Sequence, residues 1–179
     1  LEQKVPATVA DGLKAQKLTG LHFIRQEQRY YPEHTLAASV LGFVGKETDG
    51  TNVGRYGVEG YWHKELAGTG GFVAAARGAK GAWIPLAGRS FQPAQDGASL
   101  VLTIDRTLQY KACERLRAGL VEYGATSASL VIMEPHTGAI LAMCSLPDFD
   151  PNIYGKVETP EAYNNSVIFT PYEPGSIFK

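Results

Sequence analysis

The chain has 179 residues, 44% of them hydrophobic, which is enough for one or two globular domains with a buried core. Its formal net charge of -1 argues against a nucleic acid or an anionic membrane surface as the main partner, because such partners require clustered positive charge. The ordinary apolar content excludes a disordered chain, and no apolar run approaches the roughly 18 residues that a membrane span requires.

The N-terminal half predicts short helices and strands. Val5, Val9 and Leu13 recur at helical spacing, and residues 21–29 predict a strand that ends before Pro32, because proline cannot donate to a β-ladder. Further along, the sequence predicts a helix at 36–44, a polar loop at 46–54, a helix at 58–66, and a β-hairpin formed by 72–76 and 82–86.

A boundary between two regions is predicted at 88–97, where turn-forming residues gather and periodicity is weak. Residues 100–104 then predict a strand, and Asp105 is placed to cap a following helix. The apolar face of that helix recurs every fourth residue, at Leu108, Ala112, Leu116 and Leu120.

Two apolar strands are predicted after this helix, at 129–134 and 139–145, with a turn at 135–138 between them. Five prolines at 146–175 rule out long helices there. A strand, a helix and a hairpin in this order predict a helix packed on an antiparallel sheet, so the predicted fold class is α+β.

The two cysteines, Cys113 and Cys144, lack the C-x-x-C spacing of zinc or thioredoxin-like sites. Two small buried thiols are the favoured interpretation, because free cysteine is commonly buried. The alternative is a Cys113–Cys144 disulfide, which requires an oxidising compartment. No metal site is predicted from the histidines either, which show no ligand spacing: His22, His34, His63 and His136.

The sharpest local feature is the S-x-x-K spacing of Ser176 and Lys179. Residues three apart share one face of a helix, so this spacing places an amine beside a hydroxyl. A desolvated, neutral lysine can take the serine proton, and a helix N-terminus offers backbone N–H groups to a nascent oxyanion. Taken alone, the four residues are better explained by an exposed serine and lysine that do no chemistry.

Motifs that occur in order along the chain favour the catalytic interpretation of Ser176 and Lys179. From about Ala10 to Lys179 the sequence resembles a class B penicillin-binding protein, a family of peptidoglycan D,D-transpeptidases. The matching elements, in chain order, are Arg29-Tyr30-Tyr31-Pro32, Leu41-Gly42-Phe43-Val44-Gly45, Tyr56-Gly57-Val58-Glu59-Gly60-Tyr61, Leu66-Ala67-Gly68 with Gly71, Leu102-Thr103-Ile104-Asp105 with Gln109, residues 134–143, Pro147-Asp148-Phe149-Asp150-Pro151-Asn152, and Tyr172-Glu173-Pro174-Gly175-Ser176-Ile177-Phe178-Lys179. One departure is His34, which stands where the family usually has glycine.

The resemblance implies a non-catalytic pedestal domain at 1–91, followed by the N-terminal part of a transpeptidase domain at 92–179. It implies that Ser176 is the acylated nucleophile and Lys179 its general base, with no metal or organic cofactor. Arg29 and Glu59 are expected to pair within the pedestal, two separate solvated charges being the alternative.

The implied partners are a peptidoglycan stem peptide ending in D-Ala-D-Ala, β-lactam antibiotics and a SEDS-type glycan polymerase. The implied location is the extracytoplasmic face of the bacterial membrane, through an anchor upstream of Leu1, because residues 1–4 do not start a signal peptide.

Two other interpretations remain open. The chain alone is expected to be catalytically silent, because the second and third active-site motifs of the family are expected beyond Lys179. It would then serve as a non-catalytic module that contacts or activates the polymerase. A β-lactamase or β-lactam sensor shares S-x-x-K but does not explain the elements between Arg29 and Gly71.

Overall fold

The computed structural model describes residues 5–24, 28–74, 90–157 and 159–177. The chain divides into two units, Leu1–Tyr30 and Tyr31–Lys179. Lys179 and the predicted strand at 82–86 lie outside the described residues. Within the described ranges, no helix has both the length and the apolar character needed to cross a membrane.

The first unit contains helix α1, Ala7–Ala15. Its apolar spacing produces the predicted helix, although none of its residues is buried. The ammonium group of Lys14 lies 5.5 Å from the centre of the Phe23 ring. The strand predicted at 21–29 is wrong for residues 21–24, 28 and 29, which adopt no regular structure. Among the described residues, no strand pairs with them, and a lone strand is not stable.

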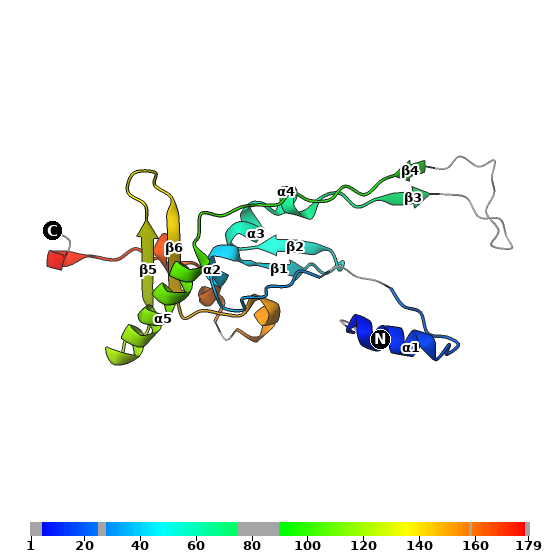
Figure 1. Cartoon of the computed structure of the whole chain (residues 1–179), viewed down its shortest axis with the longest axis horizontal. Helices are drawn as coiled ribbons and strands as arrows, with labels where there is room; N and C mark the ends of the chain where they lie inside the picture. Colours follow the sequence, from blue (N-terminus) through cyan, green and yellow to red (C-terminus); the bar gives the residue numbers. More distant parts are fainter. Residues whose placement is uncertain (1–4, 25–27, 75–89, 158, 178–179) are drawn as a thin grey trace. The chain divides into compact units, whose positions relative to one another are not determined.

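The second unit contains three separate two-stranded antiparallel sheets among its described residues (Figure 1). Its helices and strands are α2 (Ala38–Leu41), β1 (Phe43–Lys46), β2 (Asn52–Arg55), α3 (Gly57–Tyr61), α4 (His63–Ala67), β3 (Phe72–Ala74), β4 (Ser90–Gln92), α5 (Arg106–Glu122), β5 (Ala128–Met133), β6 (Ile140–Leu146), η1 (Pro151–Lys156), η2 (Pro160–Tyr163), α6 (Ser166–Phe169) and η3 (Gly175–Ile177).

The helix predicted at 36–44 is cut short by Gly42. This residue has a φ of 75°, and a Cβ there would run into the Tyr56 carbonyl oxygen, so the chain turns and Phe43 begins β1. Strand β1 pairs with β2, from Phe43 opposite Arg55 to Lys46 opposite Asn52. The loop predicted at 46–54 is therefore only partly correct, because its ends belong to these two strands. The helix predicted at 58–66 forms as α3 and α4.

Strand β3 pairs with β4, Phe72 lying opposite Gln92, so β4 falls inside the segment predicted as a boundary. The strand predicted at 100–104 is wrong: these residues form no ladder. They do run beside β6, because Thr103 Oγ1 donates to the Ile140 carbonyl oxygen at 2.6 Å and Asp105 N to that of Leu141 at 2.9 Å.

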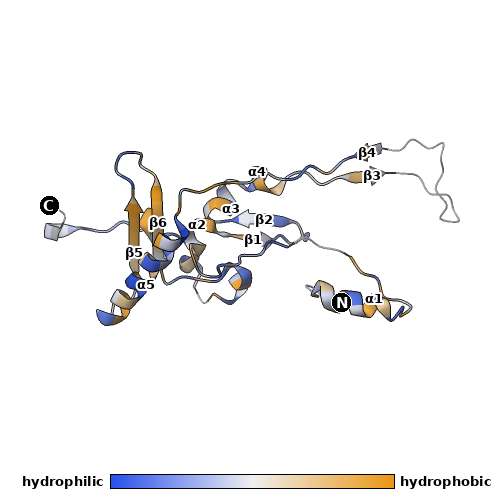
Figure 2. Ribbon diagram, viewed as in Figure 1, coloured by the Kyte–Doolittle hydropathy of each residue, from blue (hydrophilic) through white to orange (hydrophobic). Residues whose placement is uncertain are grey.

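Helix α5 packs on the β5–β6 hairpin, which confirms the α+β prediction. The Asp105 carboxylate accepts a hydrogen bond from Leu108 N at 2.8 Å, as expected of a helix cap. Figure 2 shows the largely apolar character of β5 and β6. The core between helix and hairpin consists of Ala112, Ala142 and Cys144 with the partly buried Leu108, Cys113, Leu116, Leu130 and Ile132.

A second core cluster contains Tyr31, Ala38, Phe43 and Phe149. The Phe43 ring stacks on that of Tyr154 in η1, with ring centres 4.4 Å apart. This cluster joins the segment around β1 to residues that follow the β5–β6 hairpin. Only short helices follow β6 among the described residues, as the prolines predict.

Candidate functional site

The predicted nucleophile, Ser176, lies exposed in η3, a single 3₁₀ turn. Gly175 before it has a φ of 59°, a conformation that favours glycine, so the E-P-G-S sequence forms a sharp turn at this point. Lys179 lies outside the described residues, so the proximity of its amine to Ser176 stays a prediction.

Helix α6, which lies upstream of Ser176, contacts both β5 and β6, and its side-chain hydrogen bonds go to β6. Ser145 Oγ lies 2.8 Å from Ser166 Oγ and accepts a hydrogen bond from Ser166 N at 3.1 Å. Asn165 is only 3% exposed; its Oδ1 caps α6 by accepting from Val167 N at 3.1 Å, and its Nδ2 lies 3.0 Å from Met143 Sδ. These contacts were not predicted from the sequence.

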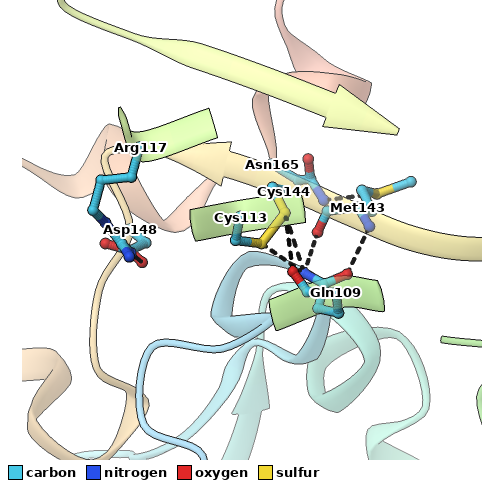
Figure 3. Close-up of a disulfide and its surroundings, with 7 residues drawn as sticks. All are labelled: Gln109, Cys113, Arg117, Met143, Cys144, Asp148 and Asn165. Carbon is cyan, nitrogen blue, oxygen red and sulfur yellow. Dashed lines mark hydrogen bonds and ion pairs between the residues drawn. A yellow bond between two sulfur atoms is a disulfide. The ribbon is translucent and has the colours of Figure 1, made fainter. Parts of the chain in front are cut away.

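Gln109 attaches α5 to the same strand (Figure 3). Its side chain is 1% exposed, donates from Nε2 to Met143 O at 2.8 Å and accepts at Oε1 from Met143 N at 2.7 Å. The amide therefore satisfies both the backbone N–H and the backbone C=O of Met143, as a neighbouring strand would. In the sequence this residue was recognised only as part of a motif.

A disulfide joins Cys113 of α5 to Cys144 of β6, with their Cα atoms 5.6 Å apart. The favoured prediction of two free thiols is therefore wrong, and the alternative is correct. Cys113 faces the sheet one helical turn after Gln109, and Cys144 follows Met143, so the two attachments lie side by side (Figure 3). Sequence spacing alone could not bring these two cysteines together.

A cleft of about 170 Å³ lies next to the disulfide, between residues 33–39 and the α5–β6 pair. Both cysteines line it. On its wall, Arg117 donates to Asp148 Oδ2 at 2.6 Å, which joins α5 to the segment after β6.

Two family-like motifs that lie far apart in the sequence meet at Tyr31 and Asn152. Tyr31 N donates to Asn152 Oδ1 at 3.0 Å, and Asn152 Nδ2 donates to Tyr31 O at 2.8 Å, across 121 residues of chain. Asp150 Oδ1 accepts from Asn152 N and its Oδ2 lies 2.9 Å from His34 Nδ1. Burial raises the pKa of Asp150, but the hydrogen bonds from His34 and Asn152 outweigh it, so this pKa lies below its ordinary value.

His34 itself has a φ of 52°, a conformation that favours glycine, the residue that the resemblance leads us to expect there. Glu59 is 6% exposed and lies 3.3 Å from the Tyr31 hydroxyl, which donates to it. The same hydroxyl accepts from Val44 N at 2.9 Å. Glu59 is therefore not a solvated surface charge, whereas its pairing with Arg29, which belongs to the other unit, stays a prediction.

Comparison with known proteins assigns the family. A model of the penicillin-binding protein dimerisation domain matches residues 3–102, and a model of the penicillin-binding protein transpeptidase domain matches residues 128–179. The chain belongs to the penicillin-binding proteins. The expected order of a dimerisation-type domain and a transpeptidase domain is thereby confirmed, and Ser176 falls within the transpeptidase match.

Relatives match over nearly the whole chain. Stage V sporulation protein D of Bacillus subtilis (strain 168) is 34% identical over 99% of this chain and 27% of its own length. The peptidoglycan D,D-transpeptidase FtsI of Escherichia coli (strain K12) is 32% identical over 100% of this chain and 29% of its own length.

Solved structures agree with this assignment. Penicillin binding protein 3 from Mycobacterium tuberculosis, complexed with aztreonam, superposes with a TM-score of 0.65 and 30% identity over 85% of this chain and 29% of its own. A peptidoglycan synthetase from Bifidobacterium adolescentis gives a TM-score of 0.67 and 26% identity over 99% of this chain and 32% of its own. The chain thus spans about a quarter to a third of the length of these relatives.

Proposed function

We propose that this chain is part of a peptidoglycan D,D-transpeptidase in which Ser176 is the acyl nucleophile and Lys179 its general base. The observation that carries the proposal is the Y-E-P-G-S-I-F-K segment inside the transpeptidase match, with Ser176 on an exposed turn after a glycine of positive φ. Residues 1–91 would form the non-catalytic pedestal, and residues 92–179 would begin the catalytic domain.

In the proposed reaction, the neutral Lys179 amine accepts the Ser176 hydroxyl proton while Oγ bonds to the carbonyl carbon of the penultimate D-Ala of a stem peptide. The bond from that carbon to the nitrogen of the terminal D-Ala breaks, and this nitrogen takes up the proton and leaves. An amine of a neighbouring stem peptide then attacks the acyl carbon, forms the cross-linking amide and returns Ser176 to its hydroxyl form. A β-lactam acylates the same oxygen when its ring amide opens. No cofactor enters either reaction.

The Cys113–Cys144 disulfide supports a location outside the cytoplasm, because disulfides persist in oxidising compartments. We place the protein at the extracytoplasmic face of the bacterial membrane, with its membrane anchor upstream of Leu1. Its substrate is there, since stem peptides ending in D-Ala-D-Ala are cross-linked outside the membrane.

The test is intact-mass spectrometry of a longer protein that carries this sequence, before and after incubation with benzylpenicillin. The expected result is one penicilloyl adduct, which Ser176→Ala abolishes and the matched variant Ser129→Ala, on the exposed face of β5, retains. No adduct on the unaltered protein, or an adduct that persists in Ser176→Ala, would refute the proposal. The 179-residue chain alone should gain no adduct.

A second function is favoured by the extent of the dimerisation-domain match, which covers residues 3–102. In this case the chain acts as a pedestal that contacts or activates a SEDS-type glycan polymerase. Co-purification of the 179-residue chain with such a polymerase, and a change in glycan synthesis when the chain is added, would support this function; failure of both would exclude it.

A further inference from the structure

The backbone of the nucleophile segment has few attachments of its own. Residues 171–176 are all exposed. Among the residues that the structure describes, the last hydrogen bond upstream of Ser176 is donated by Thr170 N to Ser166 O, at 3.3 Å. The upstream approach to Ser176 is therefore fixed at α6, and not within the E-P-G-S turn.

Helix α6 is itself too short to be stable alone, because it has only four residues and helix nucleation is costly. It packs on both strands of the β5–β6 hairpin, and its side-chain hydrogen bonds go to β6. We call these bonds the β6–α6 contact: Ser145 and Met143 on the strand, and Asn165 and Ser166 at the helix start. A single hydroxyl, Ser145 Oγ, lies within hydrogen-bond distance of both Ser166 Oγ and Ser166 N.

Burial makes this contact specific. Ser145 is 7% exposed and Asn165 is 3% exposed, so neither can exchange its partners for bulk water without opening the packing between α6 and the hairpin. Asn165 adds the cap of α6 and the contact to Met143, whose backbone is in turn paired with Gln109 (Figure 3). The sequence of contacts thus runs from α5 through β6 to α6.

We propose that Ser145, Asn165 and Ser166 are positioning residues for the nucleophile: they fix α6 on β6 and thereby the place of Ser176. This inference rests on the proposed function of Ser176. When the contact opens, the nearest upstream attachment moves back to Tyr163, whose hydroxyl donates to Tyr154 O at 2.6 Å. The tether that leads to Ser176 then becomes about twice as long, and its end samples a wider region.

Because acyl transfer depends strongly on where the attacking oxygen lies, loss of this position should slow acylation rather than weaken the noncovalent binding of a β-lactam. Removal of the Ser145 hydroxyl should lower the rate constant of acylation about tenfold and leave the dissociation constant of the initial complex within about twofold.

The first measurement uses the 179-residue chain and hydrogen exchange followed by mass spectrometry. In Ser145→Ala, amides at 167–170 should exchange at least about tenfold faster, while amides of α5 keep their rates. The control is Ser129→Ala, because Ser129 lies opposite Ser145 in the β5–β6 register but is exposed. Unchanged exchange at 167–170 in Ser145→Ala would overturn the inference.

The second measurement is benzylpenicillin acylation by a longer protein that carries this sequence. Slower acylation in Ser145→Ala and in Asn165→Ala, an unchanged dissociation constant, and recovery in Ser145→Thr, which keeps a hydroxyl, would support the positioning role. An equal acylation rate in Ser145→Ala and the unaltered protein would overturn it. If the unaltered protein is not acylated at all, the proposed function fails instead, so the two failures are distinguishable.

Discussion

Replacement of Gln109 by alanine should destabilise the second unit strongly. The side chain is 1% exposed and makes two hydrogen bonds, of 2.8 and 2.7 Å, to the backbone of Met143. A net loss of about 1 kcal/mol per hydrogen bond, with a further 1–3 kcal/mol because the partly buried Met143 backbone groups lose their partners, gives a decrease of about 3–5 kcal/mol in the free energy of unfolding.

The assay is urea unfolding of the 179-residue chain, followed by far-UV circular dichroism, with the disulfide kept intact. Gln92→Ala is the matched control, because Gln92 is an exposed glutamine in β4, and it should change the free energy of unfolding by less than about 0.5 kcal/mol. A decrease below about 1 kcal/mol in Gln109→Ala would show that the amide does not join α5 to β6 as described.

Three further predictions concern the disulfide, Asp150 and Glu59. Reduction of the Cys113–Cys144 disulfide, which closes a loop of 31 residues, should lower the free energy of unfolding by about 3–4 kcal/mol, measured by urea unfolding with and without dithiothreitol; equal midpoints would contradict this. The pKa of Asp150 is lower in the folded chain, so its contribution to stability is complete above its ordinary pKa of 3.8 and is lost as the pH falls through the folded pKa. Asp150→Asn should therefore make the free energy of unfolding depend less on pH in the acid range. An unchanged pH dependence would contradict this prediction. Glu59→Ala should reduce the thermal unfolding temperature by several degrees, because a buried hydrogen bond is lost. The control Glu65→Ala, at an exposed residue, should leave this temperature unchanged. Equal shifts in the two variants would show that Glu59 has no structural role.

The sequence predicted α5 and the β5–β6 hairpin because each is stabilised by residues close together in the sequence. Helix α5 combines the Asp105 cap with an apolar residue every fourth position, and the β5–β6 hairpin combines two apolar strands with a tight turn. The ordered motifs also predicted the family, because they combine many short matches over most of the chain.

Features that depend on long-range pairing were missed. Residues 100–104 look like a strand, but only Thr103 and Asp105 bond to β6, so no ladder forms. The disulfide required the α5–β6 packing to bring Cys113 to Cys144, which no spacing rule supplies. The contacts of Ser145 and Asn165 were missed because short polar residues before a loop carry no distinctive pattern.

The reciprocal pairing of Tyr31 with Asn152 has a consequence for biosynthesis. At about 5–20 residues per second, the ribosome needs on the order of ten seconds to synthesise the 121 residues between them. The second core cluster, which contains Tyr31 and Phe43, lacks Phe149 for almost as long. The residues around Tyr31 and Phe43 therefore have an incomplete apolar core until Phe149 and Asn152 have been synthesised. Contacts of such long sequence separation slow folding, so this part of the chain should stay incompletely packed until Asn152 has been synthesised.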